Sequence, residues 1–215
     1  MSTIANLGSH ESGIWQEFIR AEKLTERQAQ QFERYLFLLL EWNEKINLTR
    51  ITDFASIIAY HFQDSLRITD FIDFSTVNGA ADVGTGAGFP GIPLCIKFPE
   101  LRMTLLEVIE KKAEFLQLVI NELGLRNCQV STLDWRTFLR QTAEPIELFM
   151  ARASIAPEEL VRMFKPVSAY KDGQLVYWAS THWQPSRVEK PFLVRVQEYR
   201  VGDQQRVYAF FKRSI

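Results

Sequence analysis

The most informative stretch of the sequence is Asp82-Val83-Gly84-Thr85-Gly86-Ala87-Gly88-Phe89-Pro90-Gly91. It follows an apolar segment with strand character at residues 80–83 and precedes a segment with helical spacing at residues 92–98. Glycines between a strand and a helix let the backbone turn sharply and approach a ligand, and the free amides of the helix attract an anionic group. The stretch therefore predicts a ligand site at the carboxyl end of a strand in an α/β sheet. The alternative is a tight connection without a ligand.

An acidic residue, Glu107, lies at the end of the next expected strand, roughly twenty residues after the glycines. A carboxylate at this place can accept hydrogen bonds from both hydroxyls of a ribose. The alternatives for Glu107 are a carboxylate at a helix N-terminus and an ion pair with Lys111. No Lys-Ser/Thr pair follows the glycines, which disfavours a Walker-type phosphate loop. The glycine-rich stretch and Glu107 together favour a ligand that contains a nucleoside.

Two patterns fit the glycines. Gly86, Gly88 and Gly91 match G-x-G-x-x-G, which is typical of enzymes that bind nicotinamide dinucleotides. Asp82, Gly84, Gly86 and Gly88 match D-x-G-x-G-x-G, which resembles the first motif of Rossmann-like S-adenosylmethionine methyltransferases. The spacing alone does not choose between an oxidoreductase and a methyltransferase.

Outward from the loop, strand and helix patterns alternate, which predicts an α/β fold with a mostly parallel sheet covered by helices on both faces. Strands are expected at residues 80–83, 103–108, 128–131, 146–150 and 175–178, and helices at residues 92–98, 111–123, 135–140 and 157–164. Beyond these, residues 192–201 and 206–212 read as a hairpin joined at Gly202-Asp203, which would add antiparallel strands to the sheet edge.

The first 75 residues have helical spacing throughout. Thr25 and Gln28 form a capping-box pattern that opens a long helix to about Asn47, and a further helix is expected over residues 53–66. We therefore predict two parts, a helical extension at residues 1–75 and a Rossmann-like domain at residues 76–215. The aromatic residues of the extension recur at helical spacing and are expected in the core.

Composition bounds the class of protein. The chain has 215 residues, of which 47% are hydrophobic and 24% charged, which fits a globular protein and excludes disorder, collagen and coiled coil. Its 25 Lys and Arg nearly balance its 26 Asp and Glu, so net charge does not indicate a polyanionic partner. The last thirty residues are the basic end, with seven basic and three acidic side chains.

Cysteine use and hydropathy suggest a reducing, aqueous environment. Cys95 and Cys128 lie in apolar stretches, form no Cys-x-x-Cys pair and have no His cluster nearby, so we expect reduced core residues and no metal site. The longest apolar run, at residues 35–40, is far shorter than a membrane span, and the first thirty residues lack the pattern of a signal peptide. We expect a cytoplasmic protein without a membrane segment.

Five strings occur in the order found in one family: EWNEKINLT (41–49), HFQDSL (61–66), DVGTGAGFPGIPL (82–94), TLLEVIEKKAEFL (104–116) and ARASIAPEEL (151–160). They resemble the glucose-inhibited division protein B family, also known as RsmG, which methylates nitrogen-7 of a guanine in 16S ribosomal RNA. The resemblance implies a seven-stranded Rossmann-like methyltransferase fold behind an N-terminal helical extension. It further implies S-adenosyl-L-methionine as cofactor and the small ribosomal subunit as partner, with the protein acting as a monomer.

The resemblance also implies which residues form the site. Carried over by position, the cofactor site consists of Asp82, Gly84, Thr85, Gly86, Gly88, Phe89, Glu107, Leu133, Asp134, Trp135 and Arg152. The glycines would line the methionine pocket, Glu107 would hold the ribose, and residues 133–135 would border the adenine. Arg152 would face the reaction centre as the catalytic residue; its alternative is an ion pair with Glu158 or Glu159.

His61 and Asp64 match the H-x-x-D-S element of the family. The simpler interpretation is that His61 ties the N-terminal helices to the body and that Asp64, one turn along, orients it. Methylation at guanine nitrogen-7 removes no proton, so the reaction needs no general base, and the lack of an evident base or Cys nucleophile near the loop is compatible with it.

The sequence departs from the family at three places. Thr85 replaces the usual Ser and Glu107 the usual Asp, and both keep the needed oxygen. Residues 175–180 lack the Lys-Gly pair with which the family commonly continues this strand, which leaves the substrate side open. A non-catalytic RNA-binding or assembly factor that keeps the cofactor pocket is therefore an alternative, beside the oxidoreductase.

An RNA-binding surface should be basic. The candidates are Lys97, Arg102, Lys111, Lys112, Arg126, Arg162, Lys165, Arg195, Arg200, Arg206, Lys212 and Arg213. Because the net charge is near zero, we expect modest affinity for naked RNA and a requirement for the shaped ribosomal substrate.

Overall fold

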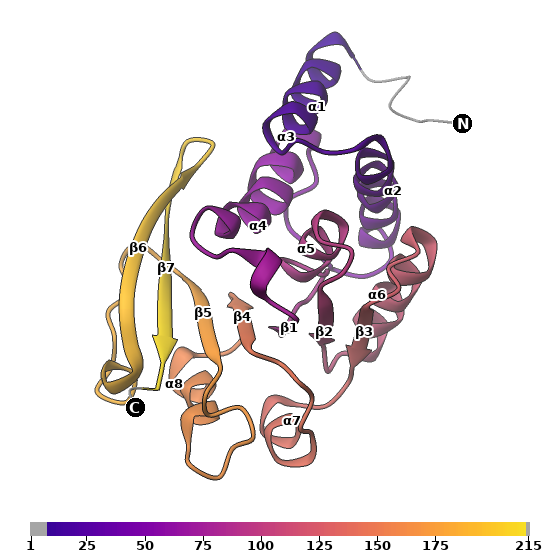
Figure 1. Cartoon of the computed structure of the whole chain (residues 1–215). Helices are drawn as coiled ribbons and strands as arrows, with labels where there is room; N and C mark the ends of the chain where they lie inside the picture. Colours follow the sequence, from indigo (N-terminus) through magenta and orange to yellow (C-terminus); the bar gives the residue numbers. More distant parts are fainter. Residues whose placement is uncertain (1–7, 214–215) are drawn as a thin grey trace.

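The computed structural model describes residues 8–213 and contains a seven-stranded sheet in the order β3-β2-β1-β4-β5-β7-β6 (Figure 1). The strands are β1 (Gly79–Val83), β2 (Arg102–Leu106), β3 (Cys128–Ser131), β4 (Leu148–Arg152), β5 (Gln174–Ala179), β6 (Leu193–Val201) and β7 (Gln204–Lys212). The first five pair in parallel, and β7 pairs antiparallel with both β5 and β6. The predicted parallel sheet with a C-terminal antiparallel hairpin is confirmed.

Helices cover both faces of this sheet. They are α1 (Ser9–Ala21), α2 (Glu26–Asn43), α3 (Phe54–Ile57), α4 (Asp64–Leu66), α5 (Gly91–Lys97), α6 (Glu110–Leu123), α7 (Trp135–Gln141) and α8 (Pro157–Leu160). Side chains alternate between the faces along each strand, so Ala80 joins the buried cluster under α1–α6 and Ala81 joins the cluster under α7 and α8. Figure 1 shows α7 and α8 on the side of the sheet away from the N-terminal helices.

The long N-terminal helix begins where the sequence predicts and ends earlier. Thr25 Oγ1 accepts from the amide of Gln28 at 3.3 Å, and Gln28 Oε1 accepts from the amide of Thr25 at 2.9 Å, which confirms the capping box. The helix ends at Asn43 rather than about Asn47. Asn43 Oδ1 accepts from the amides of Leu48 and Thr49, each at 2.9 Å, and so stabilises a turn that competes with further helix.

The expected helix over residues 53–66 is a series of short helical pieces. Asp53 caps α3 by accepting from the amide of Ser56 at 2.9 Å. A π-helical segment, Ile58–Gln63, connects α3 to α4, and a 3-10 turn, Arg67–Asp70, follows. In the same way, the helix expected over residues 157–164 is α8 followed by a 3-10 turn at Val161–Phe164. Residues 58–64 are the part of this region that reaches the site.

The N-terminal helices pack directly on the body. Trp15, Phe18, Phe32 and Tyr35 are buried, as predicted for core aromatics. The Tyr35 hydroxyl donates to the carbonyl of Ala87, within the glycine loop, at 2.6 Å. One buried cluster contains residues of α1–α6 and of the sheet, while the boundary at residue 75 stays a prediction.

The two cysteines, Cys95 and Cys128, are buried and free, as expected for core residues. Among residues 8–213, no helix has the length and apolar character needed to cross a membrane.

Candidate active site

A cleft of about 780 Å³ opens at the carboxyl ends of β1, β2, β4 and β5. Its walls come from the glycine loop, the segment after β2, the end of β4, and residues of the N-terminal helices and the C-terminal hairpin. Parallel sheets bind ligands at this edge, because the loops there converge and the following helices present free amides. The cleft is where the sequence places its candidate residues.

The glycine loop forms one wall. Gly84, Gly86 and Gly88 have φ values of +67°, +61° and +103°, which favour glycine over other residues. A Cβ atom at Gly84 would lie 2.4 Å from the Cβ of Ser154, whereas a Cβ at Gly86 would meet no atom within 4 Å. The backbone at Gly86 therefore faces the cleft, and a side chain there would project into space that a ligand can occupy.

Asp82 lies beneath this loop, fully buried and outside the cleft lining. Its Oδ2 accepts from the Thr85 hydroxyl at 2.6 Å and from the amide of Gly91 at 2.8 Å. Burial raises the pKa of Asp82 to about 6, against the lowering effect of these two hydrogen bonds. The structure thus places Asp82 where it shapes the loop. Gly88 also lies outside the lining, and Thr85 and Phe89 lie within it.

Glu107 follows β2 directly and lines the cleft. The predicted strand to residue 108 ends at Leu106, so the side chain leaves the sheet and turns toward the glycine loop. Its Oε2 accepts from the amide of Gly86 at 3.0 Å and its Oε1 from the amide of Ile109 at 2.9 Å. These amides, rather than Lys111, fix the carboxylate, which keeps further lone pairs for a ligand.

The turn after β3 also lines the cleft. Leu133 and Trp135 line the cleft, and the indole of Trp135 is held by a hydrogen bond from Nε1 to the carbonyl of Glu159 at 3.0 Å. Asp134 lies between them but turns to α7, where its Oδ1 accepts from the amides of Arg136 and Thr137 at 3.0 and 3.1 Å. The structure therefore gives Asp134 the role of helix cap and leaves the wall to its two apolar neighbours.

Arg152 ends β4 and points toward the N-terminal helices. Its Nη1 forms a 2.8 Å ion pair with Asp64 Oδ2 and donates to the carbonyl of Tyr60 at 3.3 Å. Its guanidinium lies over the ring of Phe89, 5.2 Å from the centroid. The alternative pairing with Glu158 or Glu159 is wrong. Glu159 pairs instead with two arginines closer to it, Arg136 and Arg162, each at 2.7 Å.

His61 joins the N-terminal helices to the site, as its simpler interpretation predicts. It stacks on Phe89 with 4.4 Å between ring centroids, and its Nε2 lies 2.7 Å from Thr49 Oγ1. Burial and the charge of Arg152 lower the pKa of His61 to about 3, so the ring is neutral near pH 7. The prediction that Asp64 orients His61 is wrong, because the carboxylate of Asp64 is occupied by Arg152 and the hydroxyl of Tyr199.

Several cleft residues lie outside the predicted cofactor site, among them three from the last three strands. Trp178, Tyr199 and Arg206 line the cleft from β5, β6 and β7. Within residues 8–213, Trp178 Nε1 and Arg206 Nε are buried and have no hydrogen-bond partner, so both donors are available to a ligand. A hairpin turn at residues 202–203 places Tyr199 opposite Arg206, as the structure shows. No pattern in the sequence indicates that this hairpin packs on the N-terminal helices.

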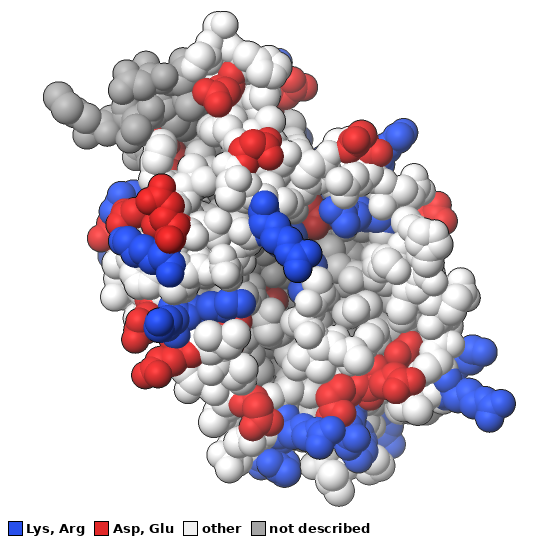
Figure 2. Space-filling model, turned by 180° about the vertical axis from the view of Figure 1, so that it is seen from behind, with Lys and Arg blue, Asp and Glu red and all other residues white. Residues whose placement is uncertain are grey.

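Of the RNA-binding candidates, Lys112 and Arg206 line the cleft. Figure 2 shows Lys and Arg interspersed with Asp and Glu on the face that it draws, without one continuous basic area. The structure thus brings two of the candidates to the cleft.

The donor set fits an adenosyl cofactor. The carboxylate of Glu107 can accept from ribose hydroxyls, the apolar Leu133 and Trp135 can border a base, and the open backbone at Gly86 leaves room beside them. The unpartnered donors of Trp178 and Arg206 add capacity for an acceptor or an anion. Among the described residues, no group of three His, Cys, Asp or Glu side chains could hold a metal ion.

Solved methyltransferases share the fold. The METTL16 MTase domain matches with a TM-score of 0.57 at 12% identity, over 86% of this chain and 80% of that domain. The mitomycin 7-O-methyltransferase MmcR matches with a TM-score of 0.57 at 14% identity, over 95% of this chain and 67% of that protein. At these identities the likeness establishes the Rossmann-like methyltransferase fold.

Sequence relatives are closer. The ribosomal RNA small subunit methyltransferase G of Geobacillus kaustophilus is 42% identical over 67% of this chain and 61% of its own length. The protein of the same name from Staphylococcus aureus is 37% identical over 81% of this chain and 73% of its own length. The matched stretch thus spans about three-fifths of the first of these relatives. The family model described as rRNA small subunit methyltransferase G matches residues 28–191, and the chain belongs to this family, GidB.

Proposed function

We propose that this protein transfers a methyl group from S-adenosyl-L-methionine to nitrogen-7 of a guanine in the 16S RNA of the small ribosomal subunit. One observation carries the proposal. A single cleft combines the wall of Gly86 and Glu107, which fits a ligand, with the partly buried guanidinium of Arg152, in a chain of the GidB family. The matched stretch spans only part of the relatives named for this activity.

The cofactor roles follow from the shape of the first wall. When bound, S-adenosyl-L-methionine supplies a methyl group on a sulfonium. We assign the methionine portion to the loop of residues 84–89, shaped from below by Asp82, and the ribose to Glu107. The adenine is assigned to Leu133 and Trp135, with Asp134 fixing the turn between them. The support is the positive φ of the glycines and the orientation of the Glu107 carboxylate by two backbone amides.

The side of the cleft that contains Arg152 and His61 suits a nucleophile that needs no general base. Guanine nitrogen-7 has a free lone pair and loses no proton on methylation, whereas a ribose hydroxyl would need a general base. His61 lines the cleft, but with a pKa of about 3 it is too weak a base near pH 7. The site therefore favours positioning of a free lone pair over proton abstraction.

Arg152 is assigned to the guanine as the catalytic residue. Its guanidinium can donate to the O6 acceptor beside nitrogen-7 on the same edge of the base. Methylation leaves the guanine positively charged, and an isolated arginine would repel that charge. The 2.8 Å ion pair with Asp64 offsets the charge of Arg152, so the donor is kept and the repulsion is reduced.

The nearly balanced charge of the chain and its interspersed surface charges (Figure 2) favour recognition of a shaped ribosomal substrate over tight binding of free RNA. We propose that the protein acts as a monomer, in the cytoplasm, on the small subunit or its precursor. Besides Arg152, the basic side chains that line the cleft are Lys112 and Arg206.

The test is methyl incorporation into small subunits from a strain that lacks the modification. Purified protein and radiolabelled S-adenosyl-L-methionine are expected to label 16S RNA, and mass spectrometry of its nucleosides is expected to show 7-methylguanosine. Folded protein that binds S-adenosylhomocysteine in calorimetry yet labels no RNA would overturn the proposal in favour of an assembly factor. Stabilisation by NAD and not by S-adenosylhomocysteine in a thermal-shift assay would favour an oxidoreductase.

A further inference from the structure

The carboxylate of Asp64 connects two distant parts of the chain at the cleft. Its Oδ2 pairs with Arg152 Nη1 at 2.8 Å, and its Oδ1 accepts from the hydroxyl of Tyr199 at 2.7 Å. Asp64 is 2% exposed and Tyr199 is 7% exposed, so solvent offers little competition for these bonds. Each carboxylate oxygen of Asp64 thus has its own donor, Arg152 on β4 or Tyr199 on β6.

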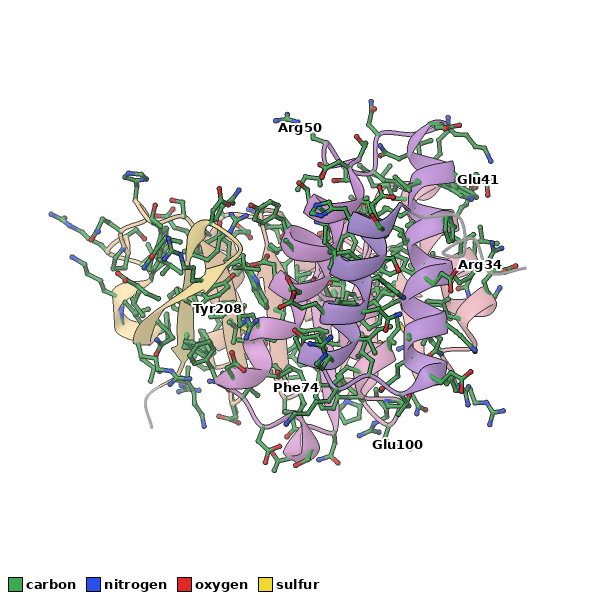
Figure 3. The ribbon with its side chains drawn as sticks, turned by 90° about the horizontal axis from the view of Figure 1, so that it is seen from above. Arg34, Glu41, Arg50, Phe74, Glu100 and Tyr208 are labelled. Atoms are coloured by element: carbon green, nitrogen blue, oxygen red, sulfur yellow. The ribbon has the colours of Figure 1, made fainter. Side chains whose placement is uncertain are left out.

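Tyr199 is itself held firmly. Its ring stacks on that of Tyr208 of β7, with 4.0 Å between centroids and 4° between planes. Figure 3 shows Tyr208 on the hairpin beside the short helices of residues 54–70, and the Tyr208 hydroxyl donates to the backbone carbonyl of Asp64 at 3.5 Å. Burial and the nearby Asp64 raise the pKa of Tyr199 well above its ordinary value, so its hydroxyl remains a donor at any working pH.

The hairpin also contacts Tyr60, whose carbonyl is the second acceptor of Arg152 Nη1. Arg152 Nη1 donates to the carbonyl of Tyr60, and the Tyr60 hydroxyl donates to Asp203 at the hairpin turn. The ring of Tyr60 also packs against Gly202 of the same turn. A Cβ atom at Gly202 would lie only 3.2 Å from the Tyr60 hydroxyl. Both residues that accept from Nη1, Asp64 and Tyr60, thus contact the C-terminal hairpin.

We propose that Tyr199 is a positioning residue, which fixes the rotation of the Asp64 carboxylate and thereby aims the guanidinium of Arg152 at the guanine. The proposal rests on the proposed function of Arg152. Tyr199 lies outside residues 28–191, so the support for this arginine comes from a strand beyond the stretch matched by the family model. Without the hydroxyl, Asp64 Oδ1 loses its donor, and the carboxylate and the guanidinium can rotate together.

The test compares Tyr199→Phe with Tyr208→Phe. Each variant loses one phenol hydroxyl from the same stacked pair, but only the first removes a donor from the Asp64 carboxylate. For Tyr199→Phe we expect kcat on small subunits to fall about tenfold, as for loss of one charge-assisted hydrogen bond, with KM and S-adenosylhomocysteine affinity within about twofold. Tyr208→Phe is expected to retain kcat within about twofold because its bond is long and neutral.

A cycle with Asp64→Asn separates positioning from general stabilisation. If Tyr199 acts through Asp64, the double variant is expected to be no slower than Asp64→Asn alone. Additive losses, or equal kcat in Tyr199→Phe and Tyr208→Phe, would overturn the proposal.

A second readout does not depend on catalysis. Side-chain nitrogen NMR of Arg152, assigned by comparison with Arg152→Lys, is expected to report faster guanidinium rotation in Tyr199→Phe and unchanged rotation in Tyr208→Phe. If wild-type protein labels no RNA while this difference is present, the proposed function fails and the positioning role stands. If rotation is the same in both variants, the positioning role fails whatever the activity.

Discussion

The two walls of the cleft are built in different ways. The wall of Gly86 and Glu107 comes from segments adjacent in the sheet, and its hydrogen bonds join a carboxylate to backbone amides. The wall of Arg152 comes from three segments far apart in sequence, and its bonds join side chains of β4, the N-terminal helices and the hairpin. The first wall depends on backbone conformation, whereas the second depends on the docking of both ends of the fold.

Because the two walls differ in this way, different substitutions are expected to affect cofactor binding and methyl transfer. A larger side chain in the glycine wall fills the space for the ligand and strains the backbone, whose φ is positive, so it should abolish cofactor binding. A change in the Arg152 wall alters the aim of one cation, so it should lower the rate and leave the cofactor in place. The predictions below test that division.

The largest effect is expected from Gly86→Val. Its side chain would project into the cleft, and we expect S-adenosylhomocysteine affinity to fall by more than about 100-fold, since a bound ligand and the side chain cannot share the space. The matched control is Gly124→Val. Gly124 has a φ of +63° and the same open surroundings, but it follows α6 away from the cleft.

Both valines are strained by about 1–2 kcal/mol in this left-handed conformation, so similar losses of melting temperature are expected. Only Gly86→Val should lose binding in calorimetry. Equal affinities in the two variants would show that the loop does not contact the cofactor.

A smaller effect is expected from Arg152→Lys. The lysine keeps a positive charge near Asp64 but loses the planar fork, so methyl transfer should fall about 30-fold while cofactor affinity changes little. Arg152→Ala is a poorer test of aim, because it leaves Asp64 buried and unpaired, at a cost of about 3–5 kcal/mol in stability.

The control for this prediction is Arg162→Lys, at an arginine that is partly exposed and pairs with Glu159. Transfer rates and calorimetric affinities are measured for both. If Arg152→Lys lost cofactor affinity and transfer rate to the same extent, the assignment of binding to one wall and transfer to the other would be wrong.

The last prediction concerns the pH dependence of stability. The pKa of His61 is about 3 in the folded protein and about 6.5 in an unfolded chain, so the unfolded state binds more protons between these values. Stability from His61 is therefore present above pH 6.5 and is lost as pH falls toward 3. We expect the melting temperature of wild type, relative to His61→Gln, to decrease over this window.

The control variant is His182→Gln, at an exposed histidine outside the cleft lining. Asp82 acts in the opposite direction, because its raised pKa of about 6 lets the folded state hold a proton as pH falls below 6. Taking differences between variants removes this contribution. A flat difference for His61→Gln would mean that the ring takes up a proton in the folded protein as readily as in the unfolded chain.

The sequence predicts what local physics determines. The glycine loop, the strand before it, Glu107 and the Thr25 cap all follow from residues close together, and the structure has them where expected. The end of α2 does not follow, because Asn43 offers its side chain to a turn that competes with the helix. The π-helical segment has no recognisable pattern in the sequence.

The partner of Arg152 is the clearest miss. Nearby Glu158 and Glu159 are reasonable partners by distance along the chain, but the tertiary fold brings Asp64 closer, across 88 residues. Tyr199 is missed for the same reason, since its pairing with Arg206 is local and its contact with Asp64 is not. Long-range contacts between side chains are set by how elements dock, which a single sequence does not report.

The chain order of the elements has a consequence for biosynthesis. Translation produces the glycine loop and Glu107 well before β6, so a nascent chain that stops short of residue 193 contains every residue of the cofactor wall. It lacks the tyrosine that supports Asp64. Under the proposed roles, the residues that hold the cofactor are made before the tyrosine that positions Arg152, so the substrate side of the cleft is completed only when the last two strands have been made.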